Sequence, residues 1–326
     1  MSGPGGSASA SAVDGPTVVA LGGGHGLFAS LSALRRVAGW LSAVVTVADD
    51  GGSSGRLREE FGVFPPGDLR MALAALCGDD DWGRTWSRLV QHRFHSDGPL
   101  HGHAVGNLLI VALWELLGDT VAGLDWVGRL LGAQGRVLPM ASVPLDIEAK
   151  VQGADPVSPG EISVVRGQVA CASTQGRVLG ISLIPSEPPA CREAVRAVRE
   201  ADWVVLGPGS WFTSVLPHLL VPELAAALLE TRARRVVALN LAPQQGETDG
   251  FSPHMHLEVL KTHAPEFVVD VVLAEREVVG DPTTLEKAAE ALGGQLVLAR
   301  VAADDGSPRH DPARLAAAYA DIFTAM

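Results

Sequence analysis

Aromatic residues, lysine and long apolar stretches are all scarce in this sequence. Aromatics make up 5% of 326 residues while 47% of the chain is hydrophobic, so we expect a core of Ala, Val and Leu. Lysine occurs only at positions 150, 261 and 287, and arginine supplies the other basic groups. No uncharged apolar run reaches the ~18 residues of a membrane-spanning helix, so no membrane span is predicted.

Cysteine is rare too, with three scattered residues and no CxxC pair. This excludes a disulfide scaffold and a cysteine-based zinc site, and it predicts a reduced, cytoplasmic protein. The net charge of -12 argues against general binding of nucleic acid, which needs a basic surface. A small anionic ligand is compatible with this charge, because it needs only a local cluster of donors.

The first 16 residues are small and polar, and we predict that they form a disordered tail. They have no charged start followed by an apolar segment, so no signal peptide is predicted. Residues 17–326 are predicted to form a single nucleotide-binding α/β domain, with a β-rich excursion at about 143–185, where short β-type runs lie between Gly and Pro.

Apolar runs bounded by glycine or polar residues alternate with segments of helical spacing. This pattern predicts a doubly wound, Rossmann-like fold: a mainly parallel sheet with helices on both faces. Helices are predicted from Gly26 to Val37 and from Asp68, as N-cap, to Leu76. Another is predicted from Ser210 to Leu220, interrupted near Pro217. The predicted strands of the sheet are Thr17–Leu21, Leu41–Ala48, Trp203–Leu206, Val236–Leu241, Val268–Leu273 and Gln295–Val301.

The first strand runs into a glycine-rich turn that opens a helix. Free backbone N–H groups and the positive end of the helix dipole suit a phosphate at such a turn. The spacing fails the GxGxxG pattern at Leu27, which weakens an NAD(P)-binding interpretation, and a purely structural turn is the other alternative. The candidate ligand-binding residues of this turn are Gly22, Gly23, Gly24, His25 and Gly26.

The second strand is followed by two acids and then by a Gly-Ser stretch. In dinucleotide-binding folds an acid at this strand end accepts hydrogen bonds from the ribose hydroxyls. A pair of acids also suits Mg²⁺, although the sequence assigns no definite metal site. The Gly-Ser turn and the arginine after it suit phosphate, whereas the alternative is a solvated turn. The candidates here are Asp49, Asp50, Gly51, Gly52, Ser53, Ser54 and Arg56.

Two later strands also end in glycine or polar residues, and in a parallel sheet these ends share one edge. Together the loops are expected to enclose a ligand larger than phosphate. No nucleophile–base pair is visible in the sequence, so catalytic residues stay unassigned. The candidates are Gly207, Pro208, Gly209, Ser210, Asn240, Gly246, Glu247 and Thr248.

Several long motifs occur in an order that resembles a known family. They are GGGHG, VTVADDGGSSGRLR, PPGDLR, GHAVGNLL, LGPGSWFTS and QQGET-GF. They are similar to the YvcK family of gluconeogenesis factors, within the YvcK/CofD superfamily. The resemblance runs from about Val18 to the segment Arg309–Asp311, and it adds Asp68, Asn107 and Arg309 to the candidate ligand-binding residues.

The resemblance implies a cytoplasmic bacterial protein that binds UDP-N-acetylglucosamine (UDP-GlcNAc) and acts on cell shape, peptidoglycan supply and growth on gluconeogenic carbon. It also implies a homodimer or larger assembly and an unidentified regulatory protein partner. No firmly required cofactor follows from it. The alternative is the sister branch CofD, which transfers a phospholactate-type group from a guanosine nucleotide with magnesium; we favour binding over catalysis.

This sequence departs from the family pattern at two places. His25 stands where the family usually has Thr, so a hydroxyl near phosphate is replaced while the backbone donors remain. Many relatives also carry a Tyr shortly before the last strand. The only tyrosine here is Tyr319, which puts stacking on the ligand from that side in doubt.

Overall fold

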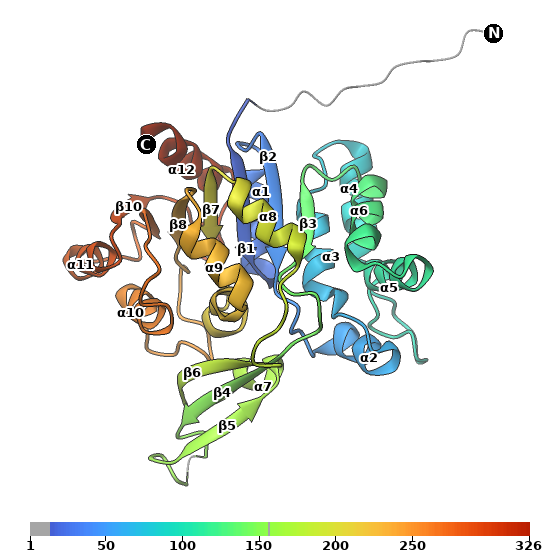
Figure 1. Cartoon of the computed structure of the whole chain (residues 1–326), viewed down its shortest axis with the longest axis horizontal. Helices are drawn as coiled ribbons and strands as arrows, with labels where there is room; N and C mark the ends of the chain where they lie inside the picture. Colours follow the sequence, from blue (N-terminus) through green and yellow to red (C-terminus); the bar gives the residue numbers. More distant parts are fainter. Residues whose placement is uncertain (1–13, 156) are drawn as a thin grey trace.

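The architecture is a seven-stranded sheet between two layers of helices, with a small β arm attached (Figure 1). The computed structural model describes residues 14–155 and 157–326. The predicted disordered tail therefore falls mostly outside the described residues. The sheet strands are β1 (Thr17–Gly22), β2 (Trp40–Val45), β3 (Arg136–Pro139), β7 (Trp203–Leu206), β8 (Arg234–Ala238), β9 (Val271–Glu275) and β10 (Gln295–Ala299).

The strand order is β10-β9-β8-β7-β1-β2-β3, and every neighbouring pair is parallel. The doubly wound α/β prediction is thus confirmed. The central strands carry Val, Leu and Ala on both faces and are almost fully buried, because helices cover each face.

Helices α1 (Gly24–Leu34), α3 (Pro66–Ala75) and α12 (Pro312–Ala325) pack together on one face, and α8 (Arg192–Glu200) packs with α9 (Pro222–Glu230) on the other. Tyr319 lies fully buried in the first layer and bonds Ser30 at 3.0 Å, so it joins α12 to α1. The remaining helices are α2 (Gly52–Phe61), α4 (Asp81–Gln91), α5 (Val105–Leu117), α6 (Thr120–Leu131), α10 (Pro253–His263) and α11 (Thr283–Ala291).

The chain reverses its direction across the sheet between β1 and β7. After β1 it adds β2 and β3 on one side, and then returns to add β7 on the other side of β1. The loops that follow β1 and β7 therefore diverge to opposite faces of the sheet. Ligands of open α/β sheets bind in the crevice that this divergence leaves.

The β-rich excursion is confirmed as a separate antiparallel sheet. It contains β4 (Asp146–Gln152), β5 (Ile162–Arg166) and β6 (Arg177–Ile184), in the order β5-β4-β6. The short helix α7 (Gln168–Ala172) connects β5 to β6. We refer to these four elements as the β arm, which projects from the body of the molecule (Figure 1).

Several predicted elements were wrong in extent or type. The second strand ends at Val45 rather than Ala48, and the first helix begins at Gly24 rather than Gly26. Asp68 is not an N-cap: Pro65 holds that position, and Asp68 lies in the first turn of α3. The segment from Ser210 to Leu220 is interrupted near Pro217, as predicted, but it is not α-helical: it consists of a π-helical turn, η1 (Trp211–Val215), and a 3-10 turn, η2 (Leu216–Leu220).

Five elements were missed altogether: the helices α2, α9, α10 and α11 and the strand β3. The stretch predicted as a Gly-Ser turn is the start of α2, whose Gly and Ser residues have low intrinsic helix propensity. Strand β3 has four residues and ends at Pro139, at the edge of the sheet, where Pro is tolerated.

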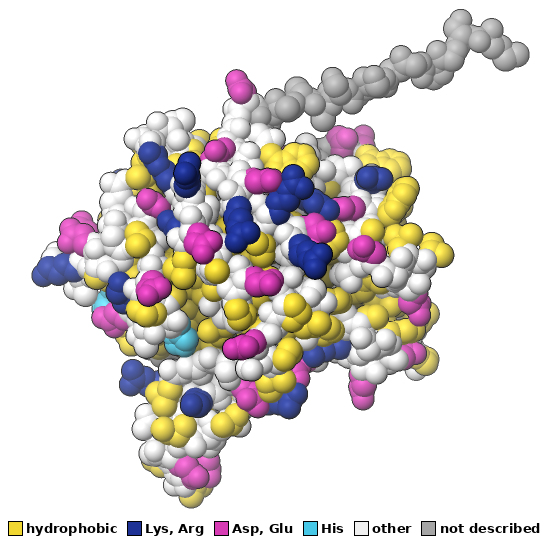
Figure 2. All heavy atoms as spheres, viewed as in Figure 1, with side chains coloured by type: hydrophobic (Ala, Val, Ile, Leu, Met, Phe, Trp, Pro, Cys, Tyr) yellow, Lys and Arg dark blue, Asp and Glu magenta, His cyan; other side chains and the backbone are white. Residues whose placement is uncertain are grey.

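The surface shows no continuous basic region on the face drawn in Figure 2, where Lys and Arg alternate with Asp and Glu. All three cysteines are free and buried. Within the described ranges no single helix has the length and apolar character to cross a bilayer. One bent pair, Trp211–Leu220 with Pro222–Glu230, passes that test by length and composition only, with a bend of 82°.

Candidate functional site

The loops after β1 and β7 pack backbone against backbone at the reversal of the sheet. A Cβ at Gly26 would collide with the carbonyl oxygen of Pro208, so only glycine permits this approach. Asn240, which follows β8, fixes the second loop: its side chain accepts from the N–H of Gly209 and donates to the C=O of Gly209, both at 2.8 Å. Three strand ends are therefore held together at one point.

A cleft of about 350 Å³ opens beside this contact, at the N-terminus of α1. The N-cap is Gly23, with no side chain to cap the helix, and Gly24 has φ +56°, which favours glycine. Backbone N–H groups at a helix start attract anions. The cleft is lined by Gly23, Gly24, His25, Gly26, Asp49, Asp68, Gln168, Val169, Ala172, Gly209, Ser210, Thr213, Ser214, Gln244, Gln245 and Glu247.

The two neighbouring acids after β2 point to different places. Asp49 lines the cleft and accepts from the N–H of Gly51 at 3.0 Å. Asp50 turns to the β arm and accepts from the N–H of Val169, at the start of α7, at 2.9 Å. Asp50 therefore anchors the arm, and Asp49 is the acid available to a ligand.

Asp68 is the second carboxyl group of the cleft. Burial, and then the nearby charge of Asp49, raise its pKa to about 7. A Cβ on Gly23 would lie 2.6 Å from Asp68 Oδ2, so the first glycine loop lies directly on this carboxyl group. No group of three or more His, Cys, Asp or Glu side chains suited to a metal ion occurs in the part of the chain that the structure describes. A cation here would need oxygens from a ligand as well.

A hydroxyl–carboxylate cluster forms the opposite wall. Ser210 and Thr213 both bond Glu247 Oε1, at 2.5 and 2.7 Å. Glu247 is 5% exposed, and its Oε2 has no hydrogen-bond partner among the described residues. Thr248 instead stabilises the turn that carries this glutamate, because its hydroxyl accepts from the N–H of Gln244 at 2.8 Å.

A second cleft of about 520 Å³ continues from the first and shares four of its lining residues. Its other walls are more apolar, with Phe28, Leu241 and Pro308. Arg309 also lines it and pairs with Asp305 at 2.6 Å. The shared residues are His25, Gly26, Gly209 and Gln244.

Arg309 reaches the site by a route that the sequence did not predict. We expected it there only if the last strand ended beside the first two, but β10 is the far edge of the sheet. The segment after β10 instead turns back, with Ala302 bridged to His310, and leads into α12 beside α1. Burial lowers the pKa of His310 to about 4, so this imidazole is neutral at physiological pH.

The remaining candidates of the α2 segment lie outside both clefts. Arg56 donates to the backbone oxygens of Pro99 and His101, at 3.2 and 2.7 Å, and so ties α2 to the segment before α5. Ser53 is buried, and its hydroxyl bonds His103 Nδ1 and Asn107 Nδ2, both at 3.0 Å. These residues form a separate polar cluster behind Asp49.

Sequence reasoning missed several lining residues. Gln168, Val169 and Ala172 come from α7, because the β arm folds back against the body. The acid pair at the end of β2 was the only local signal for this contact, and nothing in the sequence identified Asp50 as its anchor. Phe28 lies in the first helix, where its apolar side chain is indistinguishable from a core residue.

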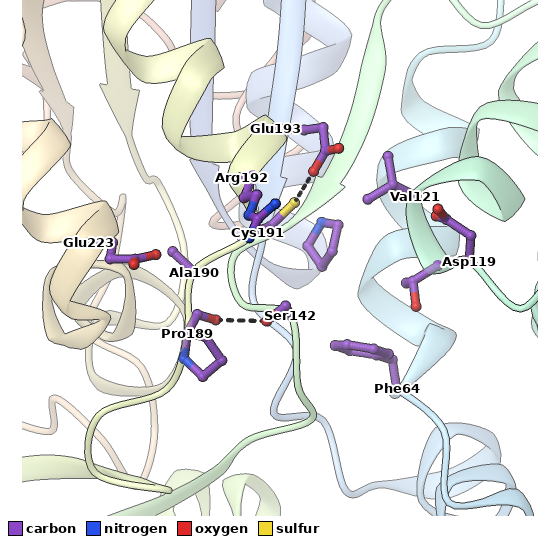
Figure 3. Close-up of a pocket in the computed structure, with 12 residues that line it drawn as sticks. Phe64, Asp119, Val121, Ser142, Pro189, Ala190, Cys191, Arg192, Glu193 and Glu223 are labelled. Atoms are coloured by element: carbon purple, nitrogen blue, oxygen red, sulfur yellow. Dashed lines mark hydrogen bonds between the residues drawn. The ribbon is translucent and has the colours of Figure 1, made fainter.

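Another cleft, of about 460 Å³, lies beside the edge strand β3 and contains none of the candidate residues (Figure 3). Cys191 bonds Glu193 there at 3.4 Å, and burial raises the pKa of its thiol to about 11. The thiol is therefore protonated and a poor nucleophile. Asp119, Glu193 and Glu223 outnumber one arginine, so this cleft does not suit an anion.

The chain matches a protein-family model described as "2-phospho-L-lactate transferase CofD" over residues 18–305. It is 55% identical over 303 residues to a Mycobacterium tuberculosis protein named "Putative gluconeogenesis factor", with 92% of this chain and 88% of that protein covered. It is 36% identical to the "Gluconeogenesis factor" of Halalkalibacterium halodurans, with 84% and 81% covered. A crystal structure of a UPF0052-family protein from Bacillus halodurans matches with a TM-score of 0.83 and 33% identity, covering 94% of this chain and 99% of that one.

Proposed function

The chain belongs to the YvcK/CofD family, and we propose that it binds a nucleotide sugar, UDP-GlcNAc, in the two joined clefts at the end of β1. In this proposal it acts as a cytoplasmic regulator of the gluconeogenesis-factor type. Binding of the ligand then controls how the protein regulates cell shape, peptidoglycan supply and growth on gluconeogenic carbon.

The observation that carries the proposal is the change of character along the joined clefts. The first has an uncapped helix start, two carboxyl groups and a hydroxyl cluster, which suit phosphates, a cation and sugar hydroxyls. The second has apolar walls and one arginine, which suit a flat base or sugar ring. A nucleotide sugar combines these groups in one molecule.

The residues have separate roles in this arrangement. The N–H groups at the start of α1 would hold the diphosphate. Asp49 and Asp68 would hold a Mg²⁺ ion, with phosphate oxygens as further ligands of that ion. The unpartnered Oε2 of Glu247 accepts from a sugar hydroxyl, because a buried acceptor gains most from such a donor. Asp68 therefore replaces Asp50 as the second acid of the proposed cation site.

A transferase of the CofD type is the second candidate function. The pKa of about 7 at the buried Asp68 favours it, because a carboxyl group titrating near neutral pH can take a proton from an acceptor hydroxyl. The guanosine nucleotide of that branch has the same diphosphate and would occupy the same helix start. Two observations distinguish the transferase from the regulator: which nucleotide base binds in the second cleft, and whether the bound nucleotide is converted to product.

Calorimetry of the purified protein against UDP-GlcNAc, UDP, GDP and NAD, each with and without Mg²⁺, tests the proposal. We expect UDP-GlcNAc to bind most tightly, more tightly with Mg²⁺, and to remain intact during long incubation. Tighter binding of GDP together with group transfer would favour the transferase. The Gly24→Val variant is the control, since a branched side chain at this positive-φ position blocks the helix start, and it should fold without binding any of the four.

A further inference from the structure

Arg70 is a buried cation. The residue is 4% exposed, and its buried Nε has no hydrogen-bond partner within residues 14–155 and 157–326. Burial, and then the nearby charge of Arg93, lower its pKa to about 10, so it still carries its charge at neutral pH. Natural proteins rarely leave a buried charge unpaired, because the lost hydration is not recovered.

The side chain of Arg70 extends along the face of α3 that meets the start of α2. Gly67 precedes Arg70 by three residues and shares its face, and helical side chains lean toward the N-terminus. A Cβ on Gly67 would collide with Ser54 Oγ and lie 2.6 Å from Asp49 Oδ2. The stem of Arg70 packs against Gly106, in the first turn of α5. The guanidinium thus lies among α2, α3 and α5.

The start of α2 offers donors to match this cation. Helix α2 has ten residues and no side-chain cap, and the N–H groups of Gly52, Ser53 and Ser54 donate to no acceptor in the described part of the chain. A helix start with free N–H groups attracts an anion. Asn107, in the first turn of α5, adds an unpartnered buried acceptor, Oδ1, which a protonated phosphate oxygen or a water molecule can satisfy.

Two carboxyl groups oppose an anion at this place and limit where it can bind. The charges of Asp68 and Asp49 act on Arg70 and favour its charged form. Arg93 adds a second positive charge in the same neighbourhood. Asp49 lies at the start of α2 itself, where it accepts from the Gly51 N–H at 3.0 Å. The favourable position for an anion is therefore on the side of Arg70 that faces Ser53 and the first turn of α5.

We propose that Arg70 and the start of α2 bind the phosphate group of a second small molecule, behind Asp49 and separate from the nucleotide-sugar clefts. The site goes beyond the proposed function, because it would exist whatever ligand occupies the two joined clefts. In this proposal the Gly-Ser stretch binds phosphate together with Arg70. Arg56, the arginine expected from the sequence, is not available, because its guanidinium bonds two backbone oxygens.

Inorganic phosphate is the probe, with chloride at equal ionic strength as the reference. In protein labelled with ¹⁵N-arginine, the buried Nε–H of Arg70 should shift on addition of phosphate and not of chloride; its signal is assigned by its absence in Arg70→Lys. In Arg70→Met the dissociation constant for phosphate should rise about tenfold or more, as expected for the loss of a charged hydrogen-bond donor.

Arg35→Met is the matched control, because Arg35 also has a buried, unpartnered Nε, yet its guanidinium pairs with Asp79 at 2.5 Å. It should bind phosphate like the wild type, and so should Gly24→Val, in which the first cleft is blocked. Equal responses of Arg70→Met and Arg35→Met, or loss of the response in Gly24→Val, would overturn the proposal. If Arg70→Met does not fold, an unmoved Nε–H signal in the wild type overturns it instead.

Discussion

Two helices of this protein begin with glycine-rich stretches and have no side-chain cap, but their surroundings differ. The start of α1 faces an open cleft of about 350 Å³ that continues into a second one. At the start of α2, Gly52 is exposed, whereas Ser53 is buried, as are Arg70 of α3 and Asn107 of α5. The same local sequence pattern thus lies in two different surroundings, because distant elements of the chain decide what packs against each helix start.

At the start of α1 a Cβ on Gly26 would collide with the carbonyl oxygen of Pro208, so the largest effect among these variants is expected there. Gly26→Val should lower the free energy of unfolding by about 3 kcal/mol or more, because the new side chain has no space against the loop after β7. At the other helix start, Gly52→Ala has open space and strain only from φ +48°, and should cost about 1–2 kcal/mol. Urea unfolding measures both; equal losses would contradict this difference between the two starts.

Asp68 lies between the two helix starts and makes stability depend on pH. Its raised pKa means that the folded state keeps a proton that the unfolded chain loses near pH 4. This contribution is present below about pH 4 and is lost as pH rises to about 7, by up to ~4 kcal/mol. Asp68→Asn should remove the slope and be more stable than the wild type above pH 7. Urea unfolding from pH 4 to pH 8 gives the slopes; parallel curves would show that Asp68 titrates normally.

The two acids after β2 separate ligand binding from the anchoring of the β arm. Asp49→Asn should weaken binding of UDP-GlcNAc with Mg²⁺ by ~1–3 kcal/mol, the scale of a hydrogen bond to a charged group. Asp50→Asn should leave the nucleotide contacts intact and increase hydrogen exchange in α7, because an amide oxygen accepts a weaker hydrogen bond from the Val169 N–H than a carboxylate does. Calorimetry and exchange on the same two variants decide this, and equal affinities would place both acids outside the site.

The arginines give the smallest expected effect and compare the open cleft directly with the α2 segment. Arg309→Ala should weaken UDP-GlcNAc binding by about 1 kcal/mol, a small loss because its side chain is largely exposed. Arg56→Ala should weaken it less, through loosening of the segment before α5. Arg234→Ala is the control, since this side chain lies over Trp203 at the amino ends of the strands. A larger loss in Arg56→Ala than in Arg309→Ala would reverse the assignment.

The fold was predictable where the signal is local. Uninterrupted apolar runs identified β1, β2 and β7, and glycine after β1 and β7 identified the helix starts at the reversal of the sheet. Helix α2 was missed because Gly and Ser favour turns, and only its packing against α3 and α5 makes it a helix. Strand β3 was missed because its four residues are too few to show the hydrophobic pattern of a strand.

The site was predictable only in part, for a similar reason. Asp49 and Asp50 are adjacent in the sequence and equivalent by pattern, yet the folding of the β arm sends one of them away from the cleft. Arg56 and Arg70 both follow motifs, but their surroundings depend on the segment between α4 and α5 and on the start of α5. Such contacts join residues that are far apart in the sequence, so no local sequence pattern reveals them.

The central position of β1 has a consequence for synthesis on the ribosome. Its partner β7 lies about 185 residues further along the chain, so at ~5–20 residues per second β1 waits roughly ten to forty seconds for that neighbour. During this time one edge of β1, which is buried from Val18 to Gly22 in the folded protein, is unpaired and prone to wrong associations. The joined clefts also do not exist before β7 and its loop are made, so the ligand cannot assist the first half of folding. Nascent chains that stop before β7 are therefore expected to depend on chaperones, and UDP-GlcNAc should not rescue them.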